Sequence, residues 1–230
     1  MNDADAPPAV PREPRGRLAR EQRLTLRDGG EVVVRPLRAD DHPIWLDGLH
    51  RLGDRSRYLR FGSLEPLRPK DEAHLFDLDG VDRVAYVAID PNDVVHPGLG
   101  ISRYVRDPVD PTAAEIATTV VDAHQGRGIA TLLISRLAEA ARANGITVFR
   151  NYVLRGNEAS LGLLAFLGAD APIDEGDVWR VDLPVPGDDP GRDHPLRAVL
   201  RAAAGGDLPW ALRRPLLREV LGRLASQDTE

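Results

Sequence analysis

The sequence predicts an α+β domain in which a mixed, mostly antiparallel sheet is flanked by helices. Two observations carry this prediction. Between residues 83 and 121, three short runs of apolar and β-branched residues are separated by turn residues, a pattern typical of meandering antiparallel strands. After Gly128 the apolar residues recur at helical spacing, which indicates that helices follow the meander. The domain is expected to span residues 24–184.

Turn residues and helix caps define the elements before the meander. Asp28-Gly29-Gly30 is a turn signal in front of a β-branched run, so a strand is expected to follow it. Asp40 or Asp41 can cap one helix, and Pro69 suits the first position of another. The expected elements of this part are a strand at residues 31–35 and helices at about 40–51, 54–61 and 69–78.

Strands and helices alternate after the meander. Gly145 is a natural stop for the helix that starts at Gly128, and Asn157 can cap a helix that ends at Gly168. Residues 177–183 alternate as a half-buried strand does. The expected strands of the meander and beyond lie at 83–89, 95–105 with a break at Pro97-Gly98, 113–121, a start at 146–149, and 177–183.

Both ends of the chain differ from the central domain. Residues 1–23 are rich in Pro, Arg, Asp and Ala and contain few apolar residues, which predicts a disordered arm. Residues 185–230 are expected to form a linker and two amphipathic helices, at 196–204 and 215–224. Packing of these helices on the domain is expected, with homodimer formation through them or binding of a partner as the alternatives.

Composition excludes several classes of site. The 230 residues include no cysteine, which excludes disulfides, thiolate zinc sites, iron–sulfur clusters and a cysteine nucleophile. The six histidines lack metal-ligand spacing, so no metal is expected. A net charge of −6 argues against nucleic acid as a partner. No segment resembles a membrane span or a secretory signal, so a cytoplasmic location without a membrane partner is expected.

The segment from Glu115 to Ala130, EIATTVVDAHQGRGIA, is where the sequence suggests chemistry. A strand runs through a loop with two glycines into a helix, and glycine lets the backbone approach a ligand closely. Free N–H groups at a helix start favour negative charge, so these groups and Arg127 are suited to a pyrophosphate. The alternative is a glycine-rich turn without a ligand, since neither a Walker A loop nor a dinucleotide fingerprint is present.

Gln125 to Ala130, QGRGIA, in this position resembles the acyl-coenzyme A signature of the GNAT superfamily of N-acetyltransferases, Arg/Gln-x-x-Gly-x-Gly/Ala. Two further segments are similar to that family. Residues 35–38 (RPLR) followed by Asp40-Asp41 resemble its first strand and helix entry. Residues 157–169 resemble its later helix, whose first Asn contacts the coenzyme. The resemblance spans about residues 24–183.

A narrower resemblance is to the bacterial protein-lysine acetyltransferases of the Pat type. Residues 54–61, DRSRYLRF, are similar to their Ser-Arg-Tyr-x-Arg-Phe segment. From the residues alone, this segment is equally an amphipathic helix whose apolar side chains join the core. Glu115 stands where these enzymes carry a catalytic glutamate.

The resemblance implies transfer of an acetyl group from acetyl-CoA to a primary amine, and the narrower resemblance implies a protein lysine. Glu115 is the expected general base, because a lysine amine with a pKa of about 10.4 arrives mostly as ammonium. The apolar neighbours of Glu115 predict partial burial, which would raise its pKa. The expected coenzyme-binding residues are Val120, through its backbone N–H, Gln125, Gly126, Arg127, Gly128, Ile129, Ala130 and Asn157.

One departure from the family leaves the general acid unassigned. Many GNAT enzymes place a tyrosine in the later helix to protonate the departing thiolate, whereas this sequence has Leu164 there. Tyr58 and Tyr152 remain open as substitutes. Two alternatives therefore stand beside a protein-lysine acetyltransferase: an enzyme for small amines or polyamines, and an acyl-CoA-binding sensor or scaffold with weak catalysis.

Overall fold

The computed structural model describes residues 21–26 and 28–186 of the chain. Its helices and strands follow the expected order, with two additional short strands at the edges. The first half contains β1 (Gln22–Thr25), β2 (Glu31–Pro36), the 3-10 turn η1 (Ala39–Asp41), α1 (His42–His50), α2 (Asp54–Phe61), α3 (Pro69–Phe76), β3 (Arg83–Ile89) and β4 (Gly98–Arg106). The second half contains β5 (Ala113–Val120), the 3-10 turn η2 (Asp122–His124), α4 (Ile129–Ala143), β6 (Val148–Leu154), α5 (Glu158–Phe166), β7 (Ile173–Asp174) and β8 (Val178–Pro184).

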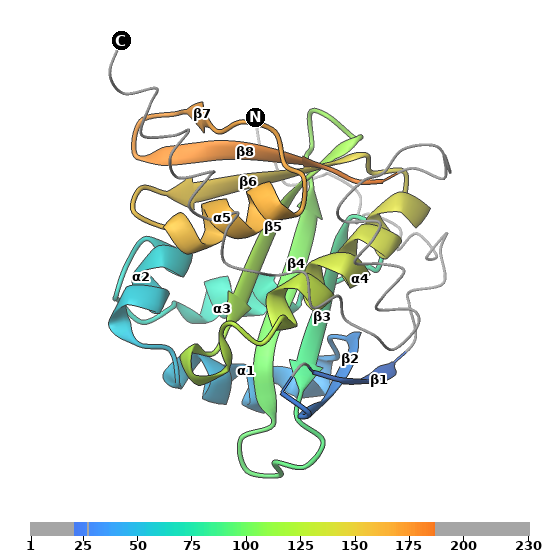
Figure 1. The fold of residues 1–230 in the computed structure, drawn as a ribbon, viewed down its shortest axis with the longest axis vertical. Coiled ribbons are helices and arrows are strands. Elements are labelled where there is room, and N and C mark those ends of the chain that lie inside the picture. The colour runs from blue at the N-terminus through green and yellow to red at the C-terminus, as the bar shows by residue number, and fades with distance from the viewer. Residues whose placement is uncertain (1–20, 27, 187–230) are drawn as a thin grey trace, which may run out of the picture.

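The strands form one eight-stranded sheet in the order β1-β2-β3-β4-β5-β6-β8-β7. Every neighbouring pair is antiparallel except β5 and β6, which are parallel because α4 carries the chain back across the sheet between them. Helices cover both faces, with α4 and α5 in front of the sheet and α1 and α3 behind it (Figure 1). The predicted class, a mixed and mostly antiparallel sheet flanked by helices, is confirmed.

The two faces of the sheet carry cores of different size. The larger core lies under α4, whose residues Leu132, Leu133 and Leu137 are fully buried against the strands. The smaller core lies on the opposite face, where Leu37, Val87 and their neighbours pack beneath the helices of the first half. Side chains of β3 and β4 contribute to both cores, so these two strands are covered on both faces.

A buried ion pair joins β2 to the start of α1. The guanidinium of Arg35 donates to both carboxylate oxygens of Asp41 at 2.6 and 2.7 Å, and the two side chains are 7% and 4% exposed. Burial raises the pKa of Asp41, but hydrogen bonds from Arg35 and from the Arg38 backbone N–H outweigh it and hold the pKa below its usual value. Asp41 occupies the N-cap position of α1 without a side-chain cap bond, because Arg35 and Arg38 take its carboxylate.

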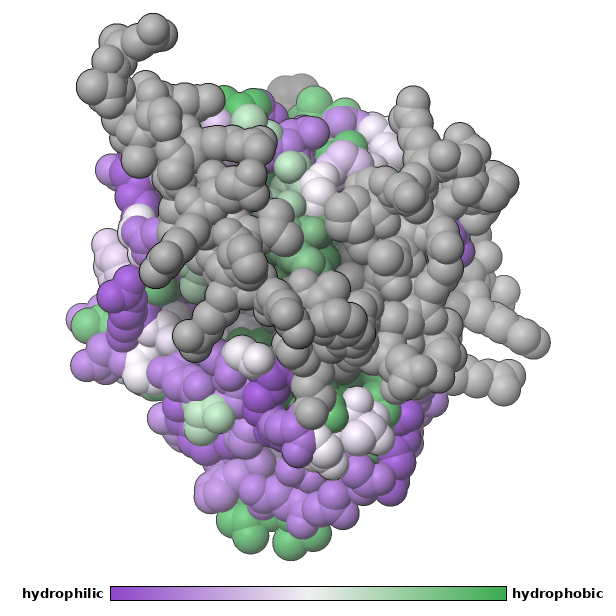
Figure 2. Space-filling view, viewed as in Figure 1, coloured by the Kyte–Doolittle hydropathy of each residue, from purple (hydrophilic) through white to green (hydrophobic). Residues whose placement is uncertain are grey.

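The main differences from the sequence expectations lie at strand ends. β4 starts at Gly98 and not at residue 95, because Asp93 accepts hydrogen bonds from the N–H groups of Val95 and His96 and closes a turn there. This turn exposes Val94 and Val95, and Figure 2 shows apolar side chains at the lower end of the molecule, where Figure 1 places the β3–β4 turn. These side chains therefore join neither core.

The strands β1 and β7 were not expected, and β1 crosses the arm boundary placed at residue 23. The rest of the expected arm and the segment after residue 186 lie outside the described residues. That segment includes both expected C-terminal helices and any homodimer contact they make. Within 21–26 and 28–186, no helix is long and apolar enough to cross a membrane, and no three His, Cys, Asp or Glu side chains gather as metal ligands.

Candidate active site

The parallel strands β5 and β6 separate part-way along their length. They pair only where Ala113–Glu115 faces Val148–Arg150. β5 nevertheless continues to Val120, paired throughout with β4, and β6 continues to Leu154, paired with β8. The edge of β5 beyond Glu115 therefore faces an opening and not a strand, and Glu115 lies at the point where the opening begins.

The backbone N–H of Val120 points into this opening. Backbone groups of successive strand residues point to alternate sides, and the N–H of Val121 donates to the Leu99 carbonyl of the β4 side at 3.0 Å. The N–H and C=O of Val120 therefore point away from β4. Its carbonyl accepts a hydrogen bond from Gln125 Nε2 at 3.2 Å, whereas its N–H pairs with no described strand. A bond from this N–H to the thioester stays a prediction.

The loop after β5 presents a row of backbone N–H groups. α4 begins at Ile129 with Gly128 at its N-cap and no side-chain cap. The first helical bond to the loop runs from the Leu132 N–H to the Gly128 carbonyl at 3.1 Å. The backbone N–H groups of residues 126–131 donate no hydrogen bond to any described residue. Six successive amides at the start of a 15-residue helix suit the oxygens of a diphosphate.

Two glycines give this loop its shape. Gly126 and Gly128 have φ of +75° and +90°, a region that residues with a side chain rarely adopt. Gly145, at the other end of α4, has nearly the same φ of +77°. A Cβ added at Gly126 or at Gly145 would meet no atom within 4 Å. Replacement of either glycine therefore tests backbone conformation without a clash.

We expect Gly126→Ala and Gly145→Ala to lower the free energy of unfolding by a similar amount, about 1–2 kcal/mol each. Only Gly126→Ala is expected to weaken acetyl-CoA binding, by several-fold, because it alone changes the direction of the loop amides. Calorimetric titration with acetyl-CoA and thermal unfolding of both variants provide the measurement. Equal coenzyme affinities for the two variants would remove the 126–131 amides from the coenzyme site.

Two of the residues predicted to bind the coenzyme already form hydrogen bonds within the protein. The Nε2 of Gln125 donates to Asp122 Oδ1 at 2.9 Å as well as to Val120, so this side chain fixes the loop. Arg127 donates to Asp28 in the β1–β2 turn, with Nε–Oδ2 at 2.5 Å and NH2–Oδ1 at 3.2 Å. A phosphate at Arg127 must therefore share the guanidinium with Asp28 or displace it.

Two positions at α5, Asn157 and Leu164, have structural roles in the helix and the core. Asn157 caps α5, with its Oδ1 accepting the Ser160 N–H at 3.2 Å, and its contact with the coenzyme stays a prediction. Leu164 is buried in the larger core, which leaves no acid on α5 at the position where many relatives carry tyrosine. Tyr58 and Tyr152 are exposed, at 49% and 46%.

Glu115 is exposed, so the expected partial burial is wrong. The reason is the alternation of the strand. Its apolar neighbours Ala114 and Ile116 point into the larger core, while Glu115 points to the opposite face together with Ala117 and Thr119. The apolar residues that flank Glu115 in sequence therefore do not surround its carboxylate. Among the described residues, no hydrogen bond or ion pair engages that carboxylate.

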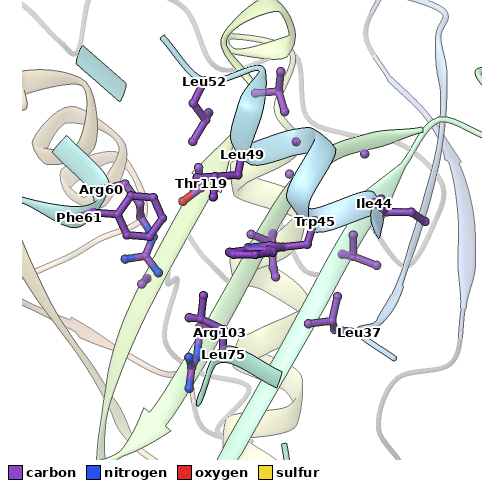
Figure 3. Close-up of a pocket in the computed structure, with 17 residues that line it drawn as sticks. Leu37, Ile44, Trp45, Leu49, Leu52, Arg60, Phe61, Leu75, Arg103 and Thr119 are labelled. Atoms are coloured by element: carbon purple, nitrogen blue, oxygen red, sulfur yellow. The ribbon is translucent and has the colours of Figure 1, made fainter. Parts of the chain in front are cut away.

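A pocket opens on the Glu115 face of the sheet, between α1, α2 and the strands β3, β4 and β5 (Figure 3). Its cavity volume is about 50 Å³, whereas a single water molecule requires roughly 10–15 Å³. Most of the lining is apolar, from Trp45 and Leu49 on α1 to Ala117 and Thr119 on β5. β5 therefore contributes its backbone edge to the opening and the side chains of Ala117 and Thr119 to this pocket.

The lining also includes two arginines, Arg60 on α2 and Arg103 on β4, to which the sequence analysis gave no role of their own. Arg60 lies in the DRSRYLRF helix. The sequence could have drawn attention to Arg103, because strand alternation places this charged residue on the same face of β4 as Ile101 and Val105. A charged residue on an apolar face of a strand points into a core or toward a ligand.

The sequence profile described as "Acetyltransferase (GNAT) family" matches residues 35–169, more than half of the chain. This range includes the β5–β6 opening, the glycine loop and Glu115. The chain belongs to the GNAT family of acetyltransferases. This match confirms the resemblance to the GNAT family that was inferred from QGRGIA. Enzymes of this family take the acetyl group from acetyl-CoA, and this GNAT protein is therefore an acyltransferase.

Individual relatives include Pat-type enzymes. Acetyltransferase PA5475 of Pseudomonas aeruginosa is 32% identical over 158 residues, which cover 68% of this chain and 84% of the relative. Acetyltransferase Pat of Mycolicibacterium smegmatis is 32% identical over 164 residues, which cover 70% of this chain and 46% of the relative. This chain thus spans under half of that Pat. The GNAT domain of S. lividans PAT superposes with a TM-score of 0.64 at 32% identity, covering 71% of this chain and 96% of that domain.

Proposed function

We propose that this GNAT enzyme transfers the acetyl group of acetyl-CoA directly to the amine of a protein lysine, with Glu115 as general base. The proposal rests on two different parts of β5. The backbone edge of β5 and the following loop offer N–H groups to the coenzyme. The face of β5 that points away from the larger core offers Glu115 and the adjacent pocket to an acceptor. Donor and acceptor can therefore meet across one strand.

The coenzyme side of the site consists of backbone donors. The N–H groups of 126–131 hold the diphosphate, with the α4 dipole adding about 0.3–1 kcal/mol per favourable contact. The Val120 N–H donates to the thioester carbonyl oxygen and stabilises the negative charge that develops there during attack. Gln125 supports this geometry indirectly, because its bond to the Val120 carbonyl joins the loop to the end of β5.

The acceptor side supplies the base. The lysine amine reacts only when neutral, and Glu115 accepts its proton directly or through one water molecule. The amine nitrogen then bonds to the thioester carbon, the carbon–sulfur bond breaks, and the coenzyme leaves as a thiolate. A covalent cysteine intermediate is excluded because the chain has no cysteine. The thiolate then takes a proton from solvent.

Turnover and binding measurements test the proposal. Purified protein is incubated with acetyl-CoA and a lysine-containing peptide, acetylation is followed by mass spectrometry, and coenzyme binding is measured by calorimetry. Peptide acetylation together with coenzyme binding supports the proposal. Absence of coenzyme binding at millimolar concentration overturns it, and binding without turnover on any amine favours the sensor or scaffold alternative. That alternative is motivated by Leu164, which leaves α5 without the tyrosine acid.

The acceptor class separates the remaining alternatives. The similarity to Pat supports a protein lysine, and a small amine or polyamine is the competing acceptor.

A cytoplasmic location stays a prediction from the sequence.

A further inference from the structure

Two guanidinium groups line the pocket on the Glu115 face, and neither has a carboxylate partner among the described residues. Arg60 enters from α2 and Arg103 from β4, so the two charges reach the pocket from different layers of the fold (Figure 3). The sheet register places Arg103 opposite Ala117 of β5. Glu115 is two residues from Ala117 on the same face, which makes Arg103 and Glu115 diagonal neighbours on adjacent strands. The two arginines are thus beside the expected base.

Arg103 is a buried cation whose hydrogen-bonding capacity is unused. The residue is 7% exposed, and its Nε and one terminal nitrogen are buried without a hydrogen-bond partner in the described part of the chain. Native proteins rarely leave such groups unpaired, because burial of an unpaired charge is costly. A ligand that accepts these hydrogen bonds therefore accounts for the arrangement, since the described residues supply no acceptor.

Arg60 adds a second charge to the same place. Its guanidinium stacks over the ring of Phe61 at 4.9 Å and donates no hydrogen bond to a described residue. Burial and the charge of Arg103 lower the pKa of Arg60 to about 10. Burial also lowers the pKa of Arg103, while the charge of Glu115 opposes the shift in both. Arg83 adds to the lowering in Arg103, and Asp77 opposes it. Both arginines remain cationic at neutral pH.

Neither arginine forms an ion pair with Glu115 within the described residues, so the expected base stays free. Two cations in a mostly apolar pocket repel a third cation and attract an anion. A polyamine, which carries a further ammonium beyond its reacting amine, fits such a pocket poorly. A carboxylate fits it well, because guanidinium groups bind carboxylates through paired charge-assisted hydrogen bonds.

We propose that Arg60 and Arg103 bind a carboxylate of the acceptor close to the amine that is acetylated. This inference rests on the proposed acetyl transfer and specifies its acceptor. The carboxylate has two possible sources. It belongs to an Asp or Glu side chain next to the target lysine in a protein, or to the main-chain carboxylate of a free amino acid.

Matched pairs of acceptors test whether the enzyme prefers an acceptor that carries a carboxylate. The first pair is a blocked peptide with Lys between two Glu residues and the same peptide with Gln in place of Glu. The second pair is L-lysine and 1,5-diaminopentane, which differ by the carboxylate. Wild-type kcat/KM is expected to be at least about tenfold higher for the carboxylate-bearing member of one pair, because charge-assisted hydrogen bonds from the two guanidinium groups favour that member. The pair that shows the preference identifies the source.

Methionine replacements assign the preference to the pocket. Arg103→Met and Arg60→Met keep much of the side-chain volume and are expected to abolish the preference by raising KM for the carboxylate-bearing acceptor. Arg57→Met, on the same helix as Arg60 but outside the pocket lining, is expected to retain it. Thermal unfolding and acetyl-CoA titration of each variant show whether it is folded and loaded with coenzyme.

Each outcome decides a different statement. Turnover that is equal for both members of both pairs overturns the carboxylate inference and leaves acetyl transfer standing. A preference that survives in folded Arg103→Met and Arg60→Met also overturns it. No turnover on any of the four acceptors, despite coenzyme binding, overturns the proposed function and the inference with it.

Discussion

Replacement of Glu115 by Gln is expected to lower kcat by about 100- to 10,000-fold, the usual contribution of a positioned general base. The amide keeps the size of the side chain but accepts no proton from the lysine ammonium, so it does not generate the neutral amine that attacks. Acetyl-CoA affinity is expected to stay the same, because the proposed coenzyme site is formed by the backbone edge of β5 and the following loop, whereas the Glu115 side chain points away from the larger core to the pocket face of the sheet. Initial rates with a lysine peptide and calorimetric titration with acetyl-CoA measure the two quantities separately.

A matched control for this variant is Glu175→Gln. Glu175 is exposed, lies between β7 and β8, and pairs with Arg180 at the far edge of the sheet. Its replacement is expected to leave kcat within a few-fold of wild type. Activity of Glu115→Gln within a few-fold of wild type, with the protein folded, would exclude Glu115 as the base. A rate that recovers at higher pH in Glu115→Gln would indicate that deprotonation of the amine limits this variant.

The sequence was sufficient for the meander and for the glycine loop between β5 and α4 because both have local signals. Short apolar runs between turn residues locate β3, β4 and β5, and two glycines between a strand and a helix locate the loop. The edge strands β1 and β7 have four and two residues, too few for a periodic pattern. Their pairing with neighbours, and not their composition, makes them strands.

The environment of Glu115 shows what a local reading of the sequence misses. Its neighbours in sequence are apolar, yet β alternation turns them to the other face, and the groups near its carboxylate come from β4 and α2. Gln125 and Arg127 illustrate the same limit. Their residue types suit phosphate, but Asp122 and Asp28 already hold them, and Asp28 is 99 positions away from Arg127 in the chain. The contact between Arg127 and Asp28 therefore follows from the tertiary fold, whereas the bond from Gln125 to Asp122 joins residues of one loop.

Arg35 and Asp41 belong to a segment that the sequence analysis associated with the family, and the structure gives that segment a role in stability. Replacement of Asp41 by Asn is expected to lower the free energy of unfolding by about 3–5 kcal/mol, because it leaves the Arg35 guanidinium buried without a counter-charge. Urea unfolding near neutral pH, followed by circular dichroism, measures this loss. The exposed neighbour Asp40 provides the control, since Asp40→Asn is expected to change stability by no more than about 0.5 kcal/mol.

The pH dependence of stability gives this ion pair a second signature. Because the pKa of Asp41 in the folded protein lies below its usual value of 3.8, its contribution is complete above that pH and is lost as the pH falls through the lower folded value. The difference in stability between wild type and Asp41→Asn is therefore expected to be constant near neutrality and to shrink in acid. The double replacement of Arg35 by Met and Asp41 by Leu removes both charges and is expected to recover much of the loss. A double variant as unstable as Asp41→Asn would show that loss of the hydrogen bond donated by the Arg38 N–H to the Asp41 carboxylate, and not the unpaired charge of Arg35, dominates the loss of stability.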